Sequence, residues 1–407
     1  MLELCSLSRA QSPPIPLEDA IREALDHNLS LVAERFNLPV AEARLITAQL
    51  RPNPVFSVGA DHLDILGTGY NLQNAAGPAE ISLRTDFLLE RGAKRAGRIA
   101  VAQDNRALVD LQLLNTVRNL VLDVQTVFTE ILLARENLSL AQDNLKAFGD
   151  IVNVNRIRVK SGDLSEVELL RTELAQLQFE NAVRQAGLRQ STARNRLQSL
   201  LGRDRSAPLV DVSGKMRKDI QPVDREKLEQ SALDARPDLL GLRRDQARSL
   251  SELRLQLAQG KVDYTVGSEY RRQQGLGGRG NSVGLFFSAS LPVYNRNQGE
   301  IERARQEQRQ IEARLKALTA AIRTEVETAY LQHATARTTL DRIENTMLAK
   351  ARDVRRIMEY SYRRGEASLV EFLDAQRAYN ETIQAYNEAQ AEFARSLYQL
   401  DAVSGKR

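Results

Sequence analysis

The sequence predicts a mainly α-helical protein with a small β part, in which one set of elements occurs twice. Three observations lead to this prediction. Only 22 of the 407 residues are Gly and 11 are Pro, while 27% are charged, and charged blocks without Pro are typical of long helices. Apolar residues in these blocks recur every three or four positions, which is the helical period. Short motifs also recur in the same order in the two halves of the chain.

Internal repetition defines the expected domains. The segment Gly162–Leu170 matches Gly365–Leu373 at five of nine positions, and Gly202 near the end of the first half recurs as Gly405 near the end of the second. Because these matches keep their order, each half is expected to be one copy of the same structural unit. The chain is therefore divided into an N-terminal segment (1–15), a first repeat (16–205), a linker (206–221) and a second repeat (222–405).

Each half is expected to begin with a helix, which is followed by two short strands and then by two long helices that form a coiled-coil hairpin. Pro39 is expected to kink or break the first opening helix. The expected ranges are 17–50 and 224–258 for the opening helices, 54–66, 79–89, 262–272 and 281–291 for the strands, and 98–201 and 298–403 for the hairpins.

The four strands have the length and the alternation of transmembrane β-strands. In the last strand, for example, Val283, Leu285 and Phe287 lie on one face. Strands of about ten residues cross a bilayer, but the smallest closed barrels need about eight strands. An open sheet edge is not tolerated in lipid, because its backbone groups would lack hydrogen-bond partners. Several copies of the chain are therefore expected to share one barrel.

Several motifs resemble those of the TolC-type outer-membrane factor family, also called outer membrane efflux proteins, over essentially the whole chain. The motifs are the opening Leu17-x-x-Ala20 with Ala24-Leu25-x-x-Asn28, the paired repeats, and the turns Ser161-Gly162 and Arg364-Gly365. Two further motifs, Gly92–Arg95 and Leu291–Ile301, are similar to those of the heavy-metal cation branch of the family, which is CzcC-like.

The resemblance implies a homotrimer in the outer membrane of a Gram-negative bacterium. Each chain would contribute four transmembrane β-strands to a shared β-barrel in contact with outer-membrane lipid, and the long helices would form an α-barrel in the periplasm. The channel would be passive. An inner-membrane RND-type pump, which contacts the channel only indirectly, would drive export through a periplasmic adaptor (membrane fusion protein).

The resemblance also implies two groups of site residues near the hairpin turns. Three carboxylates, Glu371, Asp374 and Glu168, would line the pore at the gate, where a ring of acids attracts cations. The alternative is an ordinary solvated helix face. Residues at the tips, most of them small, would dock the adaptor, although the same residues also suit helix capping; they are Gly162, Leu164, Ser165, Gly365, Ala367 and Ser368.

Other classes of site are not indicated. The net charge of +4 argues against a nucleic-acid partner on bulk charge, and a single cysteine, Cys5, excludes an intrachain disulfide. His27, His62 and His333 are isolated and lack metal-ligand spacing. No catalytic motif is present, so neither an enzyme nor a cofactor is expected.

Some alternatives stay open at this point. The same architecture would serve as a TolC-type channel for drugs or other organic compounds, and a soluble coiled-coil scaffold is the alternative from a different class. Ser8 and Ala10 fit a signal-peptidase site, so residues 1–15 are interpreted as the remnant of a targeting segment, and the true start codon and lipidation of Cys5 are undecided.

Overall fold

A computed structural model describes residues 13–63, 65–67, 79–204, 206–219, 222–275 and 278–406. The expectations placed on residues 1–12, including Cys5, lie outside this part of the chain. The chain divides into two compact units. Unit 1 contains the described residues up to Arg35 together with 112–240 and 318–406, and unit 2 contains 36–111 and 241–317. The long helices α4 and α8 and the helix α7 contribute residues to both units.

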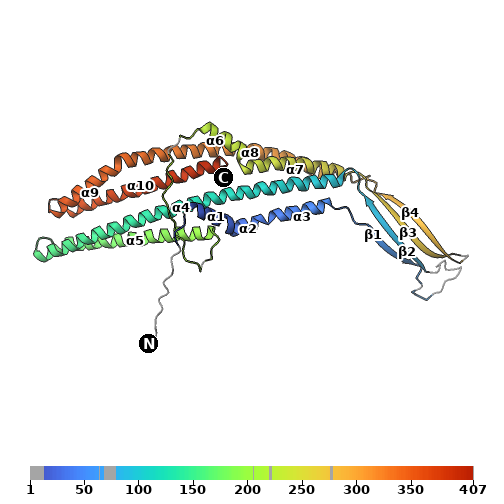
Figure 1. Ribbon diagram of the computed structural model, residues 1–407, viewed down its shortest axis with the longest axis horizontal. Helices are drawn as coiled ribbons and strands as arrows, with labels where there is room; N and C mark the ends of the chain where they lie inside the picture. The colour runs from blue at the N-terminus through green and yellow to red at the C-terminus, as the bar shows by residue number, and fades with distance from the viewer. Residues whose placement is uncertain are drawn as a thin grey trace, which may run out of the picture. The chain divides into compact units, whose positions relative to one another are not determined.

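The element order repeats as the sequence predicts (Figure 1). The first half contains α1 (Leu17–His27), α2 (Leu29–Arg35), α3 (Asn37–Gln49), β1 (Val55–Asp61), β2 (Glu80–Leu89), α4 (Lys94–Ser161) and α5 (Glu166–Leu200). The second half contains α6 (Arg225–Ala235), α7 (Pro237–Gln259), β3 (Tyr264–Gly275), β4 (Gly278–Ala289), α8 (Gln298–Arg342), the π-helical turn η1 (Ile343–Met347), α9 (Leu348–Arg363) and α10 (Leu369–Val403).

The prediction of a single opening helix in each half is wrong in detail. The first breaks after His27 and again at Phe36, and the second breaks at Arg236. Asn28 ends α1 and its Oδ1 accepts a hydrogen bond from the backbone N–H of Leu31, so it starts the next helix. Arg236 precedes a proline, which disfavours helical backbone at that residue.

Pro39 lies in the first turn of α3, which begins at Asn37. The backbone N–H groups of a first helical turn have no intrahelical acceptor, so a proline is tolerated there. The break expected near this proline is therefore confirmed, and it falls just before α3 at Phe36 rather than at Pro39 itself.

Unit 2 contains a four-stranded antiparallel sheet with the order β1-β2-β3-β4. The register pairs Val58 with Leu83 and Phe87 with Val266, and it pairs Val266 with Phe287, so these residues lie on one face. The exposed side chains of this face are mainly apolar, and each of the following is at least 40% exposed: Phe56, Val58, Ile81, Leu83, Phe87, Leu89, Val266, Val283, Leu285 and Phe287.

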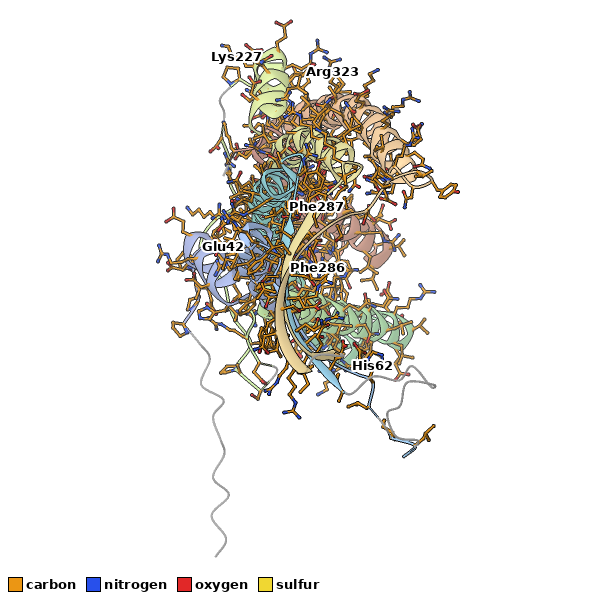
Figure 2. All side chains as sticks on the ribbon, turned by 90° about the vertical axis from the view of Figure 1, so that its right-hand side faces the viewer. Glu42, His62, Lys227, Phe286, Phe287 and Arg323 are labelled. Carbon is orange, nitrogen blue, oxygen red and sulfur yellow. The ribbon has the colours of Figure 1, made fainter. Side chains whose placement is uncertain are left out.

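The opposite face of the sheet is mainly polar and charged. Phe286, next to Phe287 on β4, lies on this face, and both residues are labelled in Figure 2. The guanidinium of Arg84 lies 4.4 Å from the centre of the Phe286 ring and bonds to Asp86 at 2.8 Å. Arg271 pairs with Glu269 at 2.9 Å. Among the described residues, no helix combines the length and hydrophobicity needed to cross a bilayer.

Two glycines at matched positions end the last helix of each repeat in unit 1. Gly202 has φ of 69° and Gly405 has φ of 76°, in the left-handed region. A Cβ atom on Gly202 would lie 2.1 Å from the carbonyl oxygen of His27, and one on Gly405 would lie 2.9 Å from the carbonyl carbon of Ala235. In each repeat the last helix therefore packs against the end of the opening helix through a glycine, which explains why this residue recurs.

We predict that Gly202→Ala lowers the midpoint of thermal unfolding, followed by the far-UV circular dichroism of the purified protein. The left-handed backbone and the contact with His27 together cost about 1–3 kcal/mol for a residue with a side chain. Gly187→Ala is the matched control, because this glycine lies within α5 with open space around its Cβ position and alanine stabilises a helix interior by about 0.5–1 kcal/mol. Equal midpoints for the two variants would contradict the interpretation.

Candidate functional site

The two hairpin turns in unit 1 have the same backbone structure. Gly162 (φ 84°) ends α4, and the N–H of the next residue donates to the carbonyl oxygen of Arg158 at 2.8 Å. Gly365 (φ 77°) ends α9, and the N–H of the next residue donates to the carbonyl oxygen of Ser361 at 2.9 Å. This bond over five residues with a left-handed glycine is a Schellman cap. It positions the tip residues identified from the sequence.

The helices that leave the turns are capped by serines. Ser165 accepts a hydrogen bond from the N–H of Glu168, and Ser368 accepts one from the N–H of Glu371. The two tips are neighbours within the unit, since a Cβ on Gly365 would lie 3.6 Å from Nη2 of Arg158. All six residues predicted to dock the adaptor therefore lie in or directly after the two turns.

Glu371 completes a capping box at the start of α10. Its Oε2 accepts hydrogen bonds from both the backbone N–H and the hydroxyl of Ser368, each at 2.8 Å. These bonds, first from the backbone and then from the side chain, lower the pKa of the Glu371 carboxyl. The carboxylate is exposed, and it stays ionised to lower pH than a glutamate without these bonds.

Asp374 lies three residues after Glu371, on the same side of α10. Its side chain is 65% exposed and lies 3.8 Å from Arg377, so the pair is a weak surface ion pair. Glu168 lies at the matching position of α5, where its carbonyl oxygen accepts a hydrogen bond from Thr172 at 2.7 Å. The pore-lining role of these three carboxylates stays a prediction for the single chain.

Below the tips, polar side chains connect α4 with α9 and α10. Asn155 is fully buried, and its Nδ2 donates to the hydroxyl of Tyr362 at 2.7 Å and to that of Thr172 at 3.0 Å. Farther along, the side-chain amides of α4 accept hydrogen bonds from α10. Each of three side-chain amides of α4 is thus hydrogen-bonded to one residue of α9 or α10. We call these three pairs the amide ladder: Asn155–Tyr362, Asn144–Gln376 (3.1 Å) and Asn137–Asn387 (2.9 Å).

Aromatic rings surround the first step of the amide ladder. Tyr362 stacks on Phe372 with ring centres 5.4 Å apart, and Phe148 packs against both Phe372 and Phe179. Burial in this cluster raises the pKa of the Tyr362 hydroxyl. Sequence reasoning missed the ladder. Asn137 and Asn144 are one heptad apart on α4, so a search for polar residues at seam positions would have found part of it.

An apolar stripe on α5 has no such partner within the described chain. Its members recur at helical spacing and are each more than half exposed: Leu170, Leu174, Leu177 and Leu188. We call these four residues the leucine stripe. A row of exposed leucines on one helix face is typical of a surface that another helix covers.

In unit 2 the motif Gly92–Arg95 fixes the start of α4 against the start of β3. Lys94 is 5% exposed at its side chain, and its Nζ donates to Asp263 Oδ2 at 2.6 Å and to the carbonyl oxygen of Lys261 at 2.8 Å. The N–H of Arg91 donates to the other carboxylate oxygen of Asp263 at 2.9 Å. The motif therefore builds a strand-to-helix junction.

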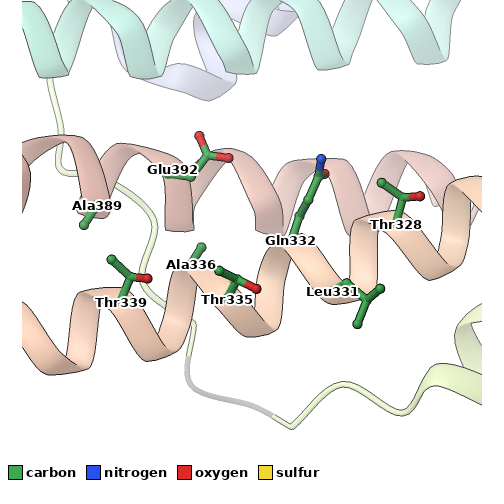
Figure 3. Close-up of a pocket in the computed structure, with 8 residues that line it drawn as sticks. All are labelled: Thr328, Leu331, Gln332, Thr335, Ala336, Thr339, Ala389 and Glu392. Atoms are coloured by element: carbon green, nitrogen blue, oxygen red, sulfur yellow. The ribbon is translucent and has the colours of Figure 1, made fainter.

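The remaining features do not add a chemical site. The described residues contain no group of three His, Cys, Asp or Glu side chains placed to hold a metal ion. His333 is buried, with Nδ1 3.1 Å from the Ser396 hydroxyl, and burial lowers its pKa. A cavity of about 390 Å³ lies between α8 and α10 (Figure 3), and its one charged lining residue, Glu392, is paired with Arg395.

Comparison with known proteins identifies the family. The model of the family described as "Outer membrane efflux protein" matches residues 20–203 and 228–406, which is most of the chain. The chain belongs to the outer membrane efflux protein family. The two matched segments correspond to the two halves of the repeated structure.

One sequence relative and two solved structures illustrate the similarity. The cobalt-zinc-cadmium resistance protein CzcC of Cupriavidus metallidurans is 22% identical over 91% of this chain and 85% of its own length. A crystal structure of CusC superposes with a TM-score of 0.78 at 16% identity, over 96% of this chain and 92% of the other. The outer membrane channel CmeC of Campylobacter jejuni gives 0.76 at 14% identity, over 98% and 90%.

Family membership confirms the main functional prediction. This efflux protein is a passive duct of the outer membrane with a periplasmic helical extension, and it is a channel rather than an enzyme. The scaffold alternative is thereby rejected. The fold of this efflux protein, mainly helical with a small antiparallel sheet, is also as predicted.

We predict that Tyr362→Phe destabilises the efflux protein by about 1–3 kcal/mol, because it leaves a buried donor on Asn155 with one acceptor fewer. The measurement is the midpoint of chemical unfolding, together with amide hydrogen exchange near the tip. Tyr360→Phe is the control on the same helix, since that tyrosine is 59% exposed and its hydroxyl accepts a hydrogen bond from the exposed side chain of Arg364. If Tyr360→Phe lowered the stability as much as Tyr362→Phe, the buried hydrogen bond between Asn155 and Tyr362 would not be the cause of the loss.

Proposed function

We propose that three copies of this chain assemble into one conduit that crosses the outer membrane as a shared β-barrel and continues as an α-barrel. The observation that carries the proposal is the amphipathic sheet. In the described chain β1 and β4 are the outer strands, so each has one edge without a partner strand. Three four-stranded sheets joined edge to edge would close into a barrel, with the apolar face toward lipid and the charged face toward the lumen.

The helices support the same assembly. The leucine stripe on α5 is exposed in the single chain, and a helix of a neighbouring copy would cover it. The two repeats, 16–205 and 222–405 with the linker 206–221, would then alternate around the ring as pseudo-equivalent units. The segmented match to the family, over 20–203 and 228–406, supports this division.

We infer that the exported substrate is a heavy-metal cation. The relative from Cupriavidus metallidurans is named for resistance to cobalt, zinc and cadmium, and it matches this chain over most of its length. Glu371 and Asp374 would add six carboxylates at the tip of a trimer, with Glu168 on the matching helix. Such a ring attracts cations and repels anions. The alternative is a channel for organic compounds, and the experiment below distinguishes the two.

The tips would bind a periplasmic adaptor, which in turn connects the channel to an inner-membrane RND-type pump. Tight turns with small residues allow the hairpin tips of another protein to approach closely. The residues that would make this contact are Gly162, Leu164, Ser165, Gly365, Ala367 and Ser368. The Schellman hydrogen bonds at Gly162 and Gly365 also give the two turns a defined backbone conformation, so the proposed docking surface would be preformed.

Assembly is tested with Leu174→Glu. A charge at the centre of the leucine stripe is expected to convert the detergent-extracted trimer into monomers, because an ionised carboxylate would be buried between helices. The control is Leu174→Met, which conserves volume and apolar character. The particle mass is the readout. A Leu174→Glu particle that keeps the mass of a trimer, or a wild-type particle that is not trimeric, would contradict the proposal.

Cation preference is tested with Asp374→Asn and Glu371→Gln in planar bilayers. Both variants are expected to shift the reversal potential in a salt gradient toward that of a non-selective pore. Glutamine can also occupy this position of a capping box, so Glu371→Gln separates the charge from the helix cap. An unchanged reversal potential in both variants would contradict the proposal that these carboxylates line the pore.

The substrate is tested by deleting the gene in its host. Greater sensitivity to cobalt, zinc or cadmium salts is expected, and plasmid-borne wild-type protein is expected to restore tolerance. Sensitivity limited to organic dyes and antibiotics would instead support the organic-compound channel.

A further inference from the structure

An apolar cleft in unit 1 has no part in the proposed conduit. The cleft has a volume of about 540 Å³, and α1, α4, the start of α7 and the end of α10 form its walls. All of its lining residues belong to unit 1. Binding sites for small molecules have volumes of roughly 300–1,000 Å³ and mostly apolar walls. The α1–α10 cleft, as we call this cavity, therefore has the size of a small-molecule site.

The apolar walls of the cleft are surfaces that the core of unit 1 leaves partly uncovered. On α1, Ala20 and Ala24 are buried in this core, whereas the neighbouring Ile21 and Leu25 are only partly buried. On α4, Val124 is buried in the same core, while partly exposed residues of this helix lie along the cleft. The apolar lining residues of the two helices are Ile21, Leu25, Leu114, Val117, Val121 and Leu122. Apolar side chains of two helices around one cavity indicate a surface that an apolar ligand can cover.

One guanidinium of the cleft has fewer partners than donors. The side chain of Arg118 is 14% exposed, and its Nε and Nη1 atoms have no hydrogen-bond partner among the described residues. Its Nη2 lies 3.4 Å from Asn119 Oδ1 and 3.7 Å from Asp238, a carboxylate that already accepts hydrogen bonds from Arg236 at 2.6 and 3.1 Å. Burial, followed by the positive charge of Arg236, lowers the pKa of the Arg118 guanidinium. A buried cation with unpaired donors costs free energy, and an anion that accepted their hydrogen bonds would offset part of this cost.

Two further charged residues of the cleft, Asp401 and Lys406, lie at and just after the end of α10. Asp401 accepts a hydrogen bond from Arg217 at 2.5 Å, and its other carboxylate oxygen lies 3.8 Å from the ammonium of Lys406. The side chain of Lys406 is 71% exposed, so this is a weak surface pair that the ammonium can leave for another anion. Because Arg217 neutralises Asp401, the cations Arg118 and Lys406 give the described walls of the cleft an excess of positive charge.

We propose that the α1–α10 cleft binds the anion of a long-chain fatty acid, a ligand with one apolar chain and one carboxylate. The chain would lie against the apolar residues of α1 and α4. The carboxylate would bind Arg118, because a planar guanidinium suits two parallel hydrogen bonds to a carboxylate, and Lys406 would approach from the rim. The Arg118 side chain would turn its unpaired N–H groups into the cleft on binding. Because one chain supplies the whole cleft, the inference depends on neither the proposed trimer nor the proposed substrate.

Direct binding tests the proposal. The assembled protein is placed in phosphatidylcholine nanodiscs and dialysed against tritiated palmitate, with empty nanodiscs as the background for palmitate dissolved in lipid. Saturable binding of one palmitate per chain is expected, and no saturable binding above the background would overturn the proposal. Unlabelled palmitate is expected to compete at least about tenfold better than methyl palmitate, which has the same chain without the charge. Equal competition by the two compounds would also overturn it, because the cleft would then not recognise the carboxylate.

Arg118→Gln is expected to weaken palmitate binding by about tenfold or more, because charge-assisted hydrogen bonds to the carboxylate are lost. Arg156→Gln is the matched control on the same helix, since Arg156 pairs with Glu173 near the tip, and this variant is expected to bind palmitate as the wild type does. The unfolding midpoint of each variant is measured as well, so that a loss of binding is not confused with a loss of fold. Equal affinities of Arg118→Gln and the wild type would contradict the assigned contact.

A photoreactive analogue of palmitate locates the bound chain without any substitution in the protein. The analogue carries a diazirine on its chain, and mass spectrometry of the cross-linked wild-type protein identifies the labelled peptides. Labels within 21–25, 114–125 or 401–406 that excess palmitate abolishes are expected. Competed labels confined to other segments would overturn the proposal. The particle mass reports the trimer separately, so a failure of the fatty-acid site and a failure of the proposed assembly are distinguishable.

Discussion

The outer edges of β1 and β4, which have no partner strand within the described chain, are the constraint on which the rest of the structure depends. In a bilayer, backbone N–H and C=O groups without partners cost several kcal/mol each, so a four-stranded sheet with an apolar face is incomplete as a single chain. In the proposed trimer, further copies would supply the missing edges. A helix of a neighbouring copy would also cover the leucine stripe on α5. The exposed strand edges and the exposed leucines are thus both accounted for by one proposed assembly.

Repetition creates a second problem, which the amide ladder addresses. Long helices with an apolar residue every three or four positions can pack in several registers, and two similar hairpins in one chain multiply the choices. Asn144 and Asn155 are buried and Asn137 is partly buried, and each of the three forms a side-chain hydrogen bond to α9 or α10 in the observed register. A slip that separates Asn155 from Tyr362 and Thr172 would leave its buried amide without these partners, which costs free energy. The ladder therefore favours the observed alignment of the hairpins below the tips.

The sequence predicted the order of elements well because repetition and period reflect burial directly. It predicted four strands from alternation and two turns from glycines that do adopt positive φ. It failed where a residue's role depends on distant partners. Asn155 resembles a solvated helix residue until Tyr362 is placed beside it, and Lys94 resembles a surface cation until Asp263 reaches it. The breaks at Asn28 and Arg236 were missed because apolar periodicity continues across them.

Glu371 shows how a structural role and a channel role can reside in one carboxylate. Ser368 binds a single oxygen, Oε2, through its backbone N–H and its hydroxyl, so the side chain is held in place at the start of α10. The lowered pKa means that the folded chain binds this proton less readily than the unfolded chain. The cap therefore contributes stability above the unfolded pKa, and this contribution is lost as pH falls through the folded pKa. The same bonds that stabilise the cap keep the carboxylate ionised to lower pH than in a glutamate without them, so in the proposed trimer a ring built on Glu371 would keep its attraction for cations to lower pH as well.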